Sequence, residues 1–506
     1  MNEFVKLLSK ENQDELEALK NEDTLPLKVD PLYESLSQDQ KNGLNAILNW
    51  LTTYKQCKNE NGFFALTGSA GTGKTTLLGV LLKMLPKSYR DSRVCICAPT
   101  HKAKKVIQEK TKWRNSETLQ ALLGMKLDTN LEDFDVNNPA FSMIGDRKIR
   151  DYDLVIIDEG SMVNTDLKTT VEEACRSTGT LVLYVGDTKQ LNPVKEYTIS
   201  PALTTPQHRY DLTQIMRQGK SNPLIVLLDT LRQDIEHETH NYKSLIEQTP
   251  ENMNDKGEGY HAISDPKVYA AKMSSVFQGE EFKLDKNHCR HISWTNESIT
   301  STSSWLRNKV FQYQSTLEVG EILLSYKTIA EKDEAVIVNS DDYIVEKITD
   351  SIISDYEYPL NIHHVTLRGI DTGITTTVDI LIRNEENYNN YKSVYNGFLS
   401  KAKTQKGKAW VRFYDFKGKV LVIENINYIN EWRQKELIKK DIDYGYGITA
   451  HKSQGSTYHT VFVNYKDISN IVTFEKSDKR AAELMKKRLL YVALSRASNE
   501  AYLFIP

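Results

Sequence analysis

Residues 63–85 read FFALTGSAGTGKTTLLGVLLKML, a short apolar run, a glycine-rich turn and a second apolar stretch with helical spacing. The turn fits the pattern GxxxxGK(S/T) between a strand and a helix, the context that makes this pattern specific. Its glycines let backbone N–H groups curl around phosphate oxygens at a helix N-terminus, where the helix dipole favours an anion. We therefore predict a nucleotide-phosphate site, in which Lys74 contacts the β- and γ-phosphates and Thr75 holds magnesium. The members of this site are Gly68, Gly71, Gly73, Lys74, Thr75 and Thr76.

Short apolar runs that end in Gly, Pro, Asp or Thr recur after this motif, and helical patterns follow them. Examples are VCICAPT at 94–100, DLVIIDE at 153–159 and LVLYVGD at 181–187. Strands that are buried on both faces and alternate with helices predict a parallel α/β sheet.

Asp158 and Glu159 follow the apolar run LVII, so both carboxylates are expected to emerge together at one edge of this sheet. An acidic pair at a strand end is commonplace and often structural, but after a phosphate loop it is the expected partner. Asp158 would hold magnesium through water, and Glu159 would polarise the attacking water.

The chain has 506 residues, which at about 150 residues per domain predicts three or four domains. Hydrophobic residues make up 39% and charged residues 26%, which excludes wholesale disorder. The net charge of -3 excludes a histone-like polycation. The five cysteines are scattered and predict neither a disulfide framework nor a zinc site. The sequence contains no run of about 18 apolar residues, so we expect no membrane span. We expect a reduced, cytoplasmic protein without a membrane partner.

Changes in the pattern of apolar and polar residues divide the chain into domains. Residues 1–34 form an acidic extension, and residues 35–206 form an α/β domain with a polar insertion at 124–150 that is expected to be a hairpin. The alternation of strand and helix patterns is found again at 207–315 and at 441–506. Between them, residues 316–440 have the pattern of short strands joined by turns. This order predicts a small all-β domain inserted in a second α/β domain.

Seven segments resemble, in the family's order, the motifs of superfamily 1 DNA helicases of the RecD-like branch. They are GSAGTGKTT (68–76), APTHKAKKV (98–106), IIDEGSM (156–162), GDTKQLNPV (186–194), LTQIMRQ (212–218), TAHKSQGST (449–457) and LLYVALSRAS (489–498). The resemblance runs from about Leu36 to the C-terminus and is weakest within 330–400. It implies two RecA-like P-loop NTPase domains with ATP in the cleft between them, a hairpin insertion, and an inserted domain that is small, all-β and SH3-like.

The resemblance also implies ATP-site roles for residues outside the phosphate loop. Gln40 in LSQDQ (36–40) would pair with the adenine edge, and Gln190 would sense the γ-phosphate in a loop organised by Asp187. Arg217 and Arg496 would reach the γ-phosphate from the opposite domain, where arginine fingers contribute roughly 10³- to 10⁵-fold in rate. A lone arginine is more often a partner in a surface salt bridge, but both of these lie in family motifs. The implied catalytic set is Lys74, Glu159, Gln190, Arg217 and Arg496.

By the same resemblance, a further set of residues near strand ends contacts single-stranded DNA. Hydroxyl and N–H groups at a helix N-terminus suit a phosphate and read no sequence. The set is Pro99, Thr100, His101, Lys102, Thr118, Gln120, Asn296, Thr449, His451 and Lys452.

A separate signal lies in KAKTQKGKAWVRFYDFKGK at 401–419, where basic residues interleave with aromatic residues such as Trp410. Cations for the backbone and aromatic faces for base stacking suit single-strand binding. A solvated β edge with packed aromatic rings explains the same residues equally well, and the resemblance offers a brace for the inserted domain as a third explanation.

Together the motifs predict an ATP-driven DNA helicase that moves along single-stranded DNA, 5′ to 3′ by resemblance, and opens duplex junctions. A translocase or protein-displacing ATPase with little unwinding shares every motif, and a subunit of a nuclease-helicase is a second alternative. The motifs after residue 186 argue against a third alternative, a P-loop signalling switch. A single-strand-binding protein or other replication proteins are the expected protein partners.

The insertion at 124–150 is predicted to act as a pin that splits the duplex, with Phe134 or Phe141 stacking on the last base pair. Base–aromatic stacking contributes about 1–3 kcal/mol, comparable to a mean DNA stacking step of about 1.4 kcal/mol. Replacing residues 128–146 with a short Gly-Ser turn should therefore keep DNA-stimulated ATP hydrolysis and lose unwinding of forked duplexes. Phe134→Ala should mimic this change more closely than Phe141→Ala, because Phe134 lies nearer the expected tip. Normal unwinding by the shortened chain would place the strand splitter elsewhere.

Overall fold

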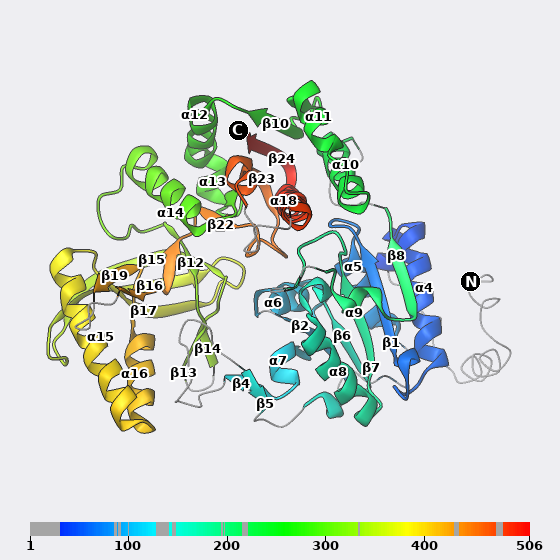
Figure 1. Cartoon of the computed structure of the whole chain (residues 1–506), viewed down its shortest axis with the longest axis horizontal. Helices are drawn as coiled ribbons and strands as arrows, with labels where there is room; N and C mark the ends of the chain where they lie inside the picture. Colours follow the sequence, from blue (N-terminus) through cyan, green and yellow to red (C-terminus); the bar gives the residue numbers. More distant parts are fainter. Residues whose placement is uncertain are drawn as a thin grey trace. The chain divides into compact units, whose positions relative to one another are not determined.

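The computed structural model divides the chain into two compact units (Figure 1). Unit 1 comprises Met1–Met125, Met143–Thr188 and Asn192–Arg217, and unit 2 comprises Lys126–Ser142, Lys189–Leu191 and Gln218–Pro506. The residues described are 31–85, 89, 93–99, 101–127, 141–143, 148–193, 196, 198–214, 221–331, 334–429, 435–471 and 479–506. Within these ranges, no helix is long and apolar enough to cross a membrane.

Unit 1 is built on a six-stranded sheet in the order β3-β2-β6-β7-β1-β8, and every neighbouring pair is parallel. The four central strands are buried along their whole length, which explains their continuous apolar sequences. The strands are β1 (Phe63–Gly68), β2 (Val94–Ala98), β3 (Ser116–Thr118), β6 (Leu154–Ile157), β7 (Leu181–Gly186) and β8 (His208–Leu212). The predicted parallel α/β core is confirmed.

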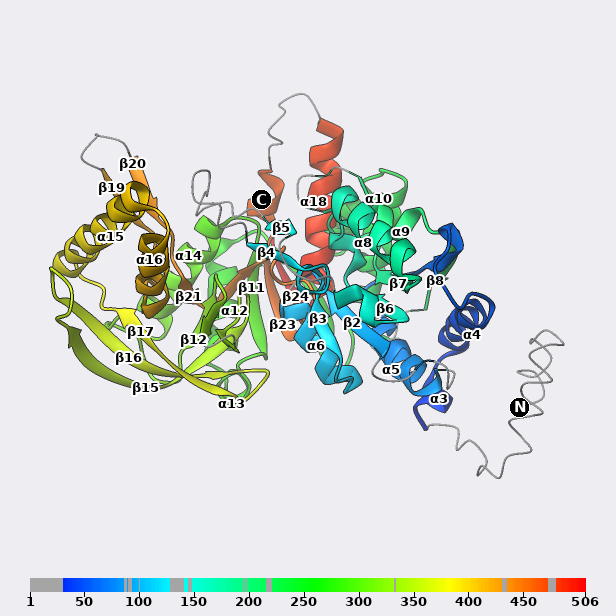
Figure 2. The same cartoon turned by 90° about the horizontal axis from the view of Figure 1, so that it is seen from below.

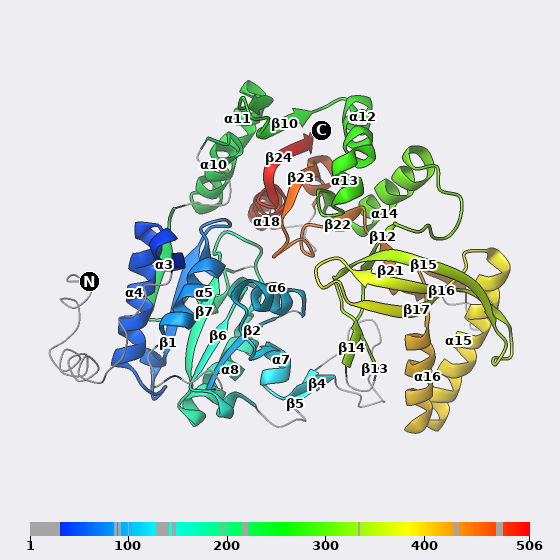
Figure 3. The same ribbon diagram turned by 180° about the vertical axis from the view of Figure 1, so that it is seen from behind.

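Helices pack along this sheet (Figure 3). They are α3 (Pro31–Ser35), α4 (Gln38–Thr53), α5 (Lys74–Met84), α6 (His101–Thr111), α7 (Leu119–Leu122), α8 (Thr165–Thr178) and α9 (Pro201–Thr204). Leu44, Ile47 and Leu51 of α4, spaced by three or four residues, are fully or almost fully buried against the sheet core.

The predicted domain boundary at residue 206 is wrong. Strand β8 pairs with β1 and so completes the first sheet, with Gly68 opposite Leu212. Its sequence HRYDL is half exposed, as suits an edge strand, and gives no continuous apolar run that would mark it as part of the first core. Unit 1 therefore continues past this strand.

Unit 2 contains a second six-stranded sheet in the order β22-β11-β23-β24-β10-β9, parallel except for the pair β9–β10. Its strands are β9 (Glu251–Met253), β10 (Gly259–Ile263), β11 (Cys289–Ser293), β22 (Gly447–Thr449), β23 (Tyr458–Asn464) and β24 (Ala497–Phe504). Its helices are α10 (Leu224–Glu236), α11 (Asn241–Gln248), α12 (Pro266–Gln278), α13 (Glu280–Leu284), α14 (Asn296–Trp305), α17 (Tyr465–Ser469) and α18 (Lys479–Leu494). This sheet is the second α/β domain that the sequence predicts.

A third sheet, in the order β18-β17-β16-β15-β12-β21, forms the insertion between β11 and β22. Its strands are β12 (Ile322–Ser325), β15 (Asp342–Ile353), β16 (Leu360–Gly369), β17 (Thr375–Leu381), β18 (Val420–Leu421) and β21 (Ile442–Tyr444). Two strand pairs accompany it, β13 (Ile329–Glu331) with β14 (Glu334–Ile337), and β19 (Ile426–Ile429) with β20 (Lys435–Ile438). Because β21 pairs with β12, the insertion extends beyond the predicted end at residue 440. Its SH3-like character stays a prediction.

The sequence predicts an all-β insertion, and this prediction is wrong. Helices α15 (Glu385–Gln405) and α16 (Lys408–Lys419) lie side by side against its sheet (Figure 2). Trp410, Phe413 and Phe416 recur every third residue, so they share one helix face, and all three are buried in one apolar cluster. Trp410 is only 5% exposed, so its predicted role in stacking on DNA bases is wrong.

The predicted hairpin at 124–150 has a paired base. Strand β4 (Met125–Leu127) leaves unit 1, and β5 (Phe141–Met143) pairs with it in a two-stranded sheet. Phe134 and the side chain of Phe141 lie outside the described residues, so the pin stays a prediction.

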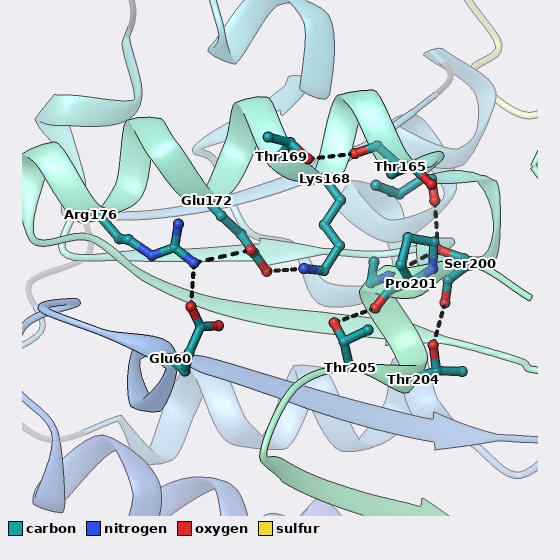
Figure 4. A network of polar contacts seen from close by, with 12 residues as sticks. Glu60, Thr165, Lys168, Thr169, Glu172, Arg176, Ser200, Pro201, Thr204 and Thr205 are labelled. Carbon is teal, nitrogen blue, oxygen red and sulfur yellow. Dashed lines mark hydrogen bonds and ion pairs between the residues drawn. The ribbon is translucent and has the colours of Figure 1, made fainter.

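A buried carboxylate anchors α8 close to the start of β1 (Figure 4). Glu172 Oε1 lies 2.6 Å from Lys168 Nζ, and Glu172 Oε2 lies 3.3 Å from Arg176 Nη2. Arg176 also contacts Glu60, at 2.6 Å, in the turn that precedes β1. Glu172 is 6% exposed, so its charge depends on these partners for stabilisation.

Glu172→Ala should lower the free energy of unfolding by about 2–4 kcal/mol, because it leaves a half-buried lysine without its carboxylate. Glu173→Ala is the matched control, since Glu173 is the neighbouring exposed carboxylate, and it should change stability by about 0.5 kcal/mol or less. The first urea unfolding transition measures both. Equal effects of the two changes would show that the network contributes nothing particular to stability.

Candidate nucleotide and DNA contact sites

The phosphate loop joins β1 to α5, as the sequence predicts. Gly71 and Gly73 have φ angles of 87° and 80°, in the left-handed region that favours glycine. Gly68 lies so close to β8 that an added Cβ would come within 2.8 Å of Leu212 Cβ and of Thr72 Oγ1. The three glycines therefore allow the loop to curl and to pack tightly against the neighbouring strand.

Lys74 is the first residue of α5, and its ammonium group lies over the loop. Its Nζ donates hydrogen bonds to the carbonyl oxygens of Gly68, at 2.7 Å, and Ser69, at 3.0 Å. Thr75 is half-buried and Thr76 is exposed in the same first helical turn. The cation, two hydroxyls and the N–H groups of a helix N-terminus form a polar surface suited to phosphate.

Gln40 holds the far side of the loop. It is the third residue of α4 in a capping box with Ser37, whose backbone N–H donates to Gln40 Oε1 at 2.9 Å. Gln40 Nε2 donates to the carbonyl oxygens of Thr72, at 3.0 Å, and Gly73, at 3.5 Å. Both ends of the amide thus have partners in the protein, and an adenine-reading role stays a prediction.

Asp158 and Glu159 emerge together at the end of β6. The backbone N–H of Asp158 donates to the carbonyl of Cys97 in β2, at 2.9 Å, which fixes the pair at the sheet edge. Burial raises the pKa of Asp158, while the backbone N–H of Glu159 and the charges of Lys74 and Lys110 act in the opposite direction. Glu159 has a φ of 52°, a conformation that costs a non-glycine residue about 1–3 kcal/mol and is most frequent at functional sites.

The donor chemistry of Thr75 and Asp158 fits magnesium. Magnesium prefers oxygen ligands and is usually held by one or two carboxylates together with substrate phosphates. The part of the chain that the structure describes contains no group of three or more His, Cys, Asp or Glu residues able to hold a metal by themselves. A site completed by phosphate oxygens is therefore the kind that these residues suit.

Gln190 belongs to unit 2 and contacts one of its motifs and the residue that precedes another. Its Oε1 accepts a hydrogen bond from Gln454 Nε2 at 3.2 Å, and its carbonyl oxygen accepts from Arg488 Nη1 at 2.5 Å. Arg488 lies in α18 one residue before the motif LLYVALSRAS, so the motif does not include it. Asp187, at the end of β7, is buried.

Of the two predicted arginine fingers, Arg496 lies among the described residues. Arg496 is 2% exposed, and its guanidinium donates to the carbonyl oxygen of Val492 at 3.1 Å and to Ser495 Oγ at 2.8 Å. Arg217 lies outside the described residues. Their roles in catalysis stay predictions.

The predicted DNA residues of unit 1 lie at the ends of β2 and β3. Pro99 follows β2, and His101 begins α6 with Lys102 next to it. The side chains of His101 and Lys102, and all of Thr100, lie outside the described residues. Thr118 is buried, and its Oγ1 caps α7 by accepting from the N–H of Ala121 at 3.3 Å. Gln120 is half-buried on α7. Thr118 therefore caps α7, and its contact with DNA stays a prediction.

The predicted DNA residues of unit 2 follow β11 and β22, two paired parallel strands. Asn296 and His451 are exposed, Lys452 is half-buried and Thr449 is 8% exposed. Asp467, which sequence reasoning missed, fixes the chain just before Asn296. Its carboxylate accepts four hydrogen bonds, from Ser293 Oγ, Trp294 N, Thr295 N and Thr295 Oγ1, at 2.6–2.9 Å.

Tyr326 joins two of these predicted DNA residues and was also missed. Lys452 Nζ lies 3.3 Å from the centroid of the Tyr326 ring, and Lys440 Nζ lies 4.8 Å from it. The Tyr326 hydroxyl donates to Asn296 Oδ1 at 3.5 Å. Tyr326 belongs to the inserted domain, directly after β12, and no local sequence pattern marks it. It therefore brings the inserted domain next to the residues of unit 2 that are predicted to contact DNA.

Comparisons with known proteins show what this chain is similar to. A family model described as an AAA domain matches residues 51–247. The ATP-dependent DNA helicase Dda of Enterobacteria phage T4 is 24% identical over 507 residues, which cover 93% of this chain and 99% of that protein. The ATP-dependent RecD2 DNA helicase of Deinococcus radiodurans is 35% identical over 160 residues, which cover 32% of this chain and 20% of that protein. A solved structure of a Pif1 helicase from Bacteroides with ADP-AlF3 and ssDNA aligns with a TM-score of 0.49 and 16% identity, over 93% of this chain and 94% of that one.

Tyr326→Leu should weaken binding of single-stranded DNA about 3- to 10-fold at low salt, because cation–π contacts of this kind contribute about 0.5–2 kcal/mol to holding the lysines. Tyr326→Phe, the matched control, keeps the ring face and should bind nearly as the unchanged chain does. Fluorescence anisotropy with a labelled oligonucleotide measures both. Unchanged affinity of the leucine variant would show that Tyr326 takes no part in DNA binding.

Proposed function

We propose that this chain, a superfamily 1 helicase of the RecD-like branch that is related to the phage Dda helicase, uses ATP hydrolysis to move along single-stranded DNA and to unwind duplex DNA. The observation that carries the proposal is the sheet edge of unit 1, where the phosphate loop after β1 and the pair Asp158–Glu159 after β6 emerge on parallel strands. The full-length relationship to a DNA helicase supports the choice among the many functions of P-loop proteins.

The residues proposed for the ATP site have separate tasks in hydrolysis. The loop N–H groups and Lys74 bind and orient the phosphates, and Glu159 accepts a proton from the attacking water. Thr75 and Asp158 would hold magnesium, which neutralises phosphate charge when it is bound. Arg217 and Arg496 are proposed to stabilise charge on the transferring phosphate, and Gln190 to sense the γ-phosphate.

Unit 2 offers contacts that suit single-stranded DNA of any sequence. Asn296, Lys452 and the half-buried Tyr326 present an amide, a cation and an aromatic ring in one cluster. Such groups bind phosphates and base faces without reading base edges. We therefore propose binding that weakens with salt and shows little sequence preference.

The experiment compares unwinding of duplexes that carry only a 5′ or only a 3′ single-stranded tail. We expect ATP-dependent unwinding of the 5′-tailed duplex, because the proposed polarity is 5′ to 3′. Glu159→Gln is the matched control: its amide keeps the size of the side chain but accepts no proton from water, so it should bind ATP without turnover or unwinding. Preference for the 3′ tail would contradict the polarity. ATP hydrolysis without unwinding of either substrate would favour a translocase that scarcely unwinds.

A further inference from the structure

Two adjacent residues in the first turn of α4 contact two different parts of unit 1. Gln40 binds the carbonyl oxygens of Thr72 and Gly73 in the phosphate loop. Asp39 instead binds the chain at the end of β8. One rigid helical turn therefore joins the loop that binds nucleotide to the strand through which the chain leaves unit 1.

The carboxylate of Asp39 accepts four hydrogen bonds from that strand end. Its Oδ2 accepts from the backbone N–H groups of Thr213, at 2.8 Å, and Gln214, at 3.0 Å, and from Thr213 Oγ1 at 3.4 Å. Its Oδ1 accepts from the hydroxyl of Tyr210 at 3.0 Å. Burial alone would raise the pKa of Asp39, but the N–H groups of Gln214 and Thr213 hold it below its usual value. Two consecutive backbone N–H groups on one carboxylate fix the direction of the chain.

The same strand end is tied to the phosphate loop a second time. Leu212 is the register partner of Gly68, and only the missing side chain of Gly68 permits their close approach. Thr67 Oγ1 also donates to Asp211 Oδ1 at 2.8 Å. Residues 211–214 are thus held against the loop from β1 on one side and from α4 on the other.

The chain that leaves this clamp leads to Arg217, three residues after Gln214, and unit 1 ends there. We propose that Asp39 is a positioning residue for ATP hydrolysis, which holds the chain leading to Arg217 in register with the phosphate loop. The proposal rests on the proposed function, and in particular on the role given there to Arg217. An acidic residue in a first helical turn also favours the helix dipole, so the test must separate positioning from helix stability.

Asp39→Ala should lower kcat of DNA-stimulated ATP hydrolysis roughly 10- to 100-fold, the scale that small misplacements of catalytic groups produce. The Kd for ADP should change less than about 3-fold, because the contacts of Gln40 to the loop are untouched. Asp39→Asn should restore most of kcat, since its carbonyl oxygen accepts the same two N–H groups. Tyr210→Phe is the matched control, because it removes one side-chain hydrogen bond to the same carboxylate and leaves both backbone N–H bonds in place, and it should hydrolyse ATP nearly as the unchanged chain does.

Thermal unfolding measures the stability of each variant. If the alanine variant does not fold, Asp39→Ser replaces Asp39→Ala. Serine keeps a polar side chain in the first helical turn, but this side chain is too short to reach both N–H groups. Unchanged kcat in the variant that folds, or a loss confined to ADP affinity, would overturn the proposal.

A double-variant cycle with Arg217→Ala decides whether Asp39 acts through Arg217. If it does, the double variant should hydrolyse ATP no more slowly than Arg217→Ala alone. Multiplying effects would overturn the proposal. Normal kcat of Arg217→Ala by itself would instead refute the role proposed for that arginine, while a slow Arg217→Ala with a normal Asp39→Ala would refute only the positioning role.

Discussion

The direction of the strands in unit 1 is the constraint on which its site depends. All neighbouring pairs of the six strands are parallel, so all six strands end at the same edge of the sheet. The phosphate loop, the acidic pair, Asp187, Pro99, Thr118 and the clamp of Asp39 each follow one of these ends. Ligand sites of open α/β sheets lie at this edge, because only there do several chain segments present side chains together. Elements far apart in sequence thereby become one candidate site.

The same rule brings together the residues of unit 2 that are predicted to contact DNA. Asn296 follows β11, and Thr449 ends β22, which pairs with β11 in parallel. Asp467 from α17 then fixes the chain before Asn296, and Tyr326 from the inserted domain covers Lys452. Parallel strands supply the edge, while single carboxylates and rings hold the side chains at it. Asp39 and Asp467 do comparable work in the two units, since each binds consecutive backbone N–H groups at a strand end.

The sequence predicts features well where the signal is local. The loop at Gly68–Thr76 and the pair Asp158–Glu159 are contiguous motifs next to apolar strands, and the structure places both as expected. The prediction of base stacking by the segment 401–419 is wrong because its aromatic residues three apart share one buried helix face. A sequence that mixes basic and aromatic residues does not show that this face is buried. Strand β8 was assigned to the wrong domain because its pairing with β1 is non-local. Asp39, Tyr326, Arg488 and Asp467 act only through tertiary contacts, so no pattern along the chain marks them.

The central claim is that ATP hydrolysis at the edge of the first sheet serves movement on single-stranded DNA. Steady-state ATP hydrolysis with increasing single-stranded oligonucleotide, against a blunt duplex of the same length, tests it most directly. We expect a rate that rises with single-stranded DNA and saturates, and that rises far less with the duplex. An identical rate with and without single-stranded DNA would contradict it, and would point to a P-loop ATPase that works on something other than nucleic acid.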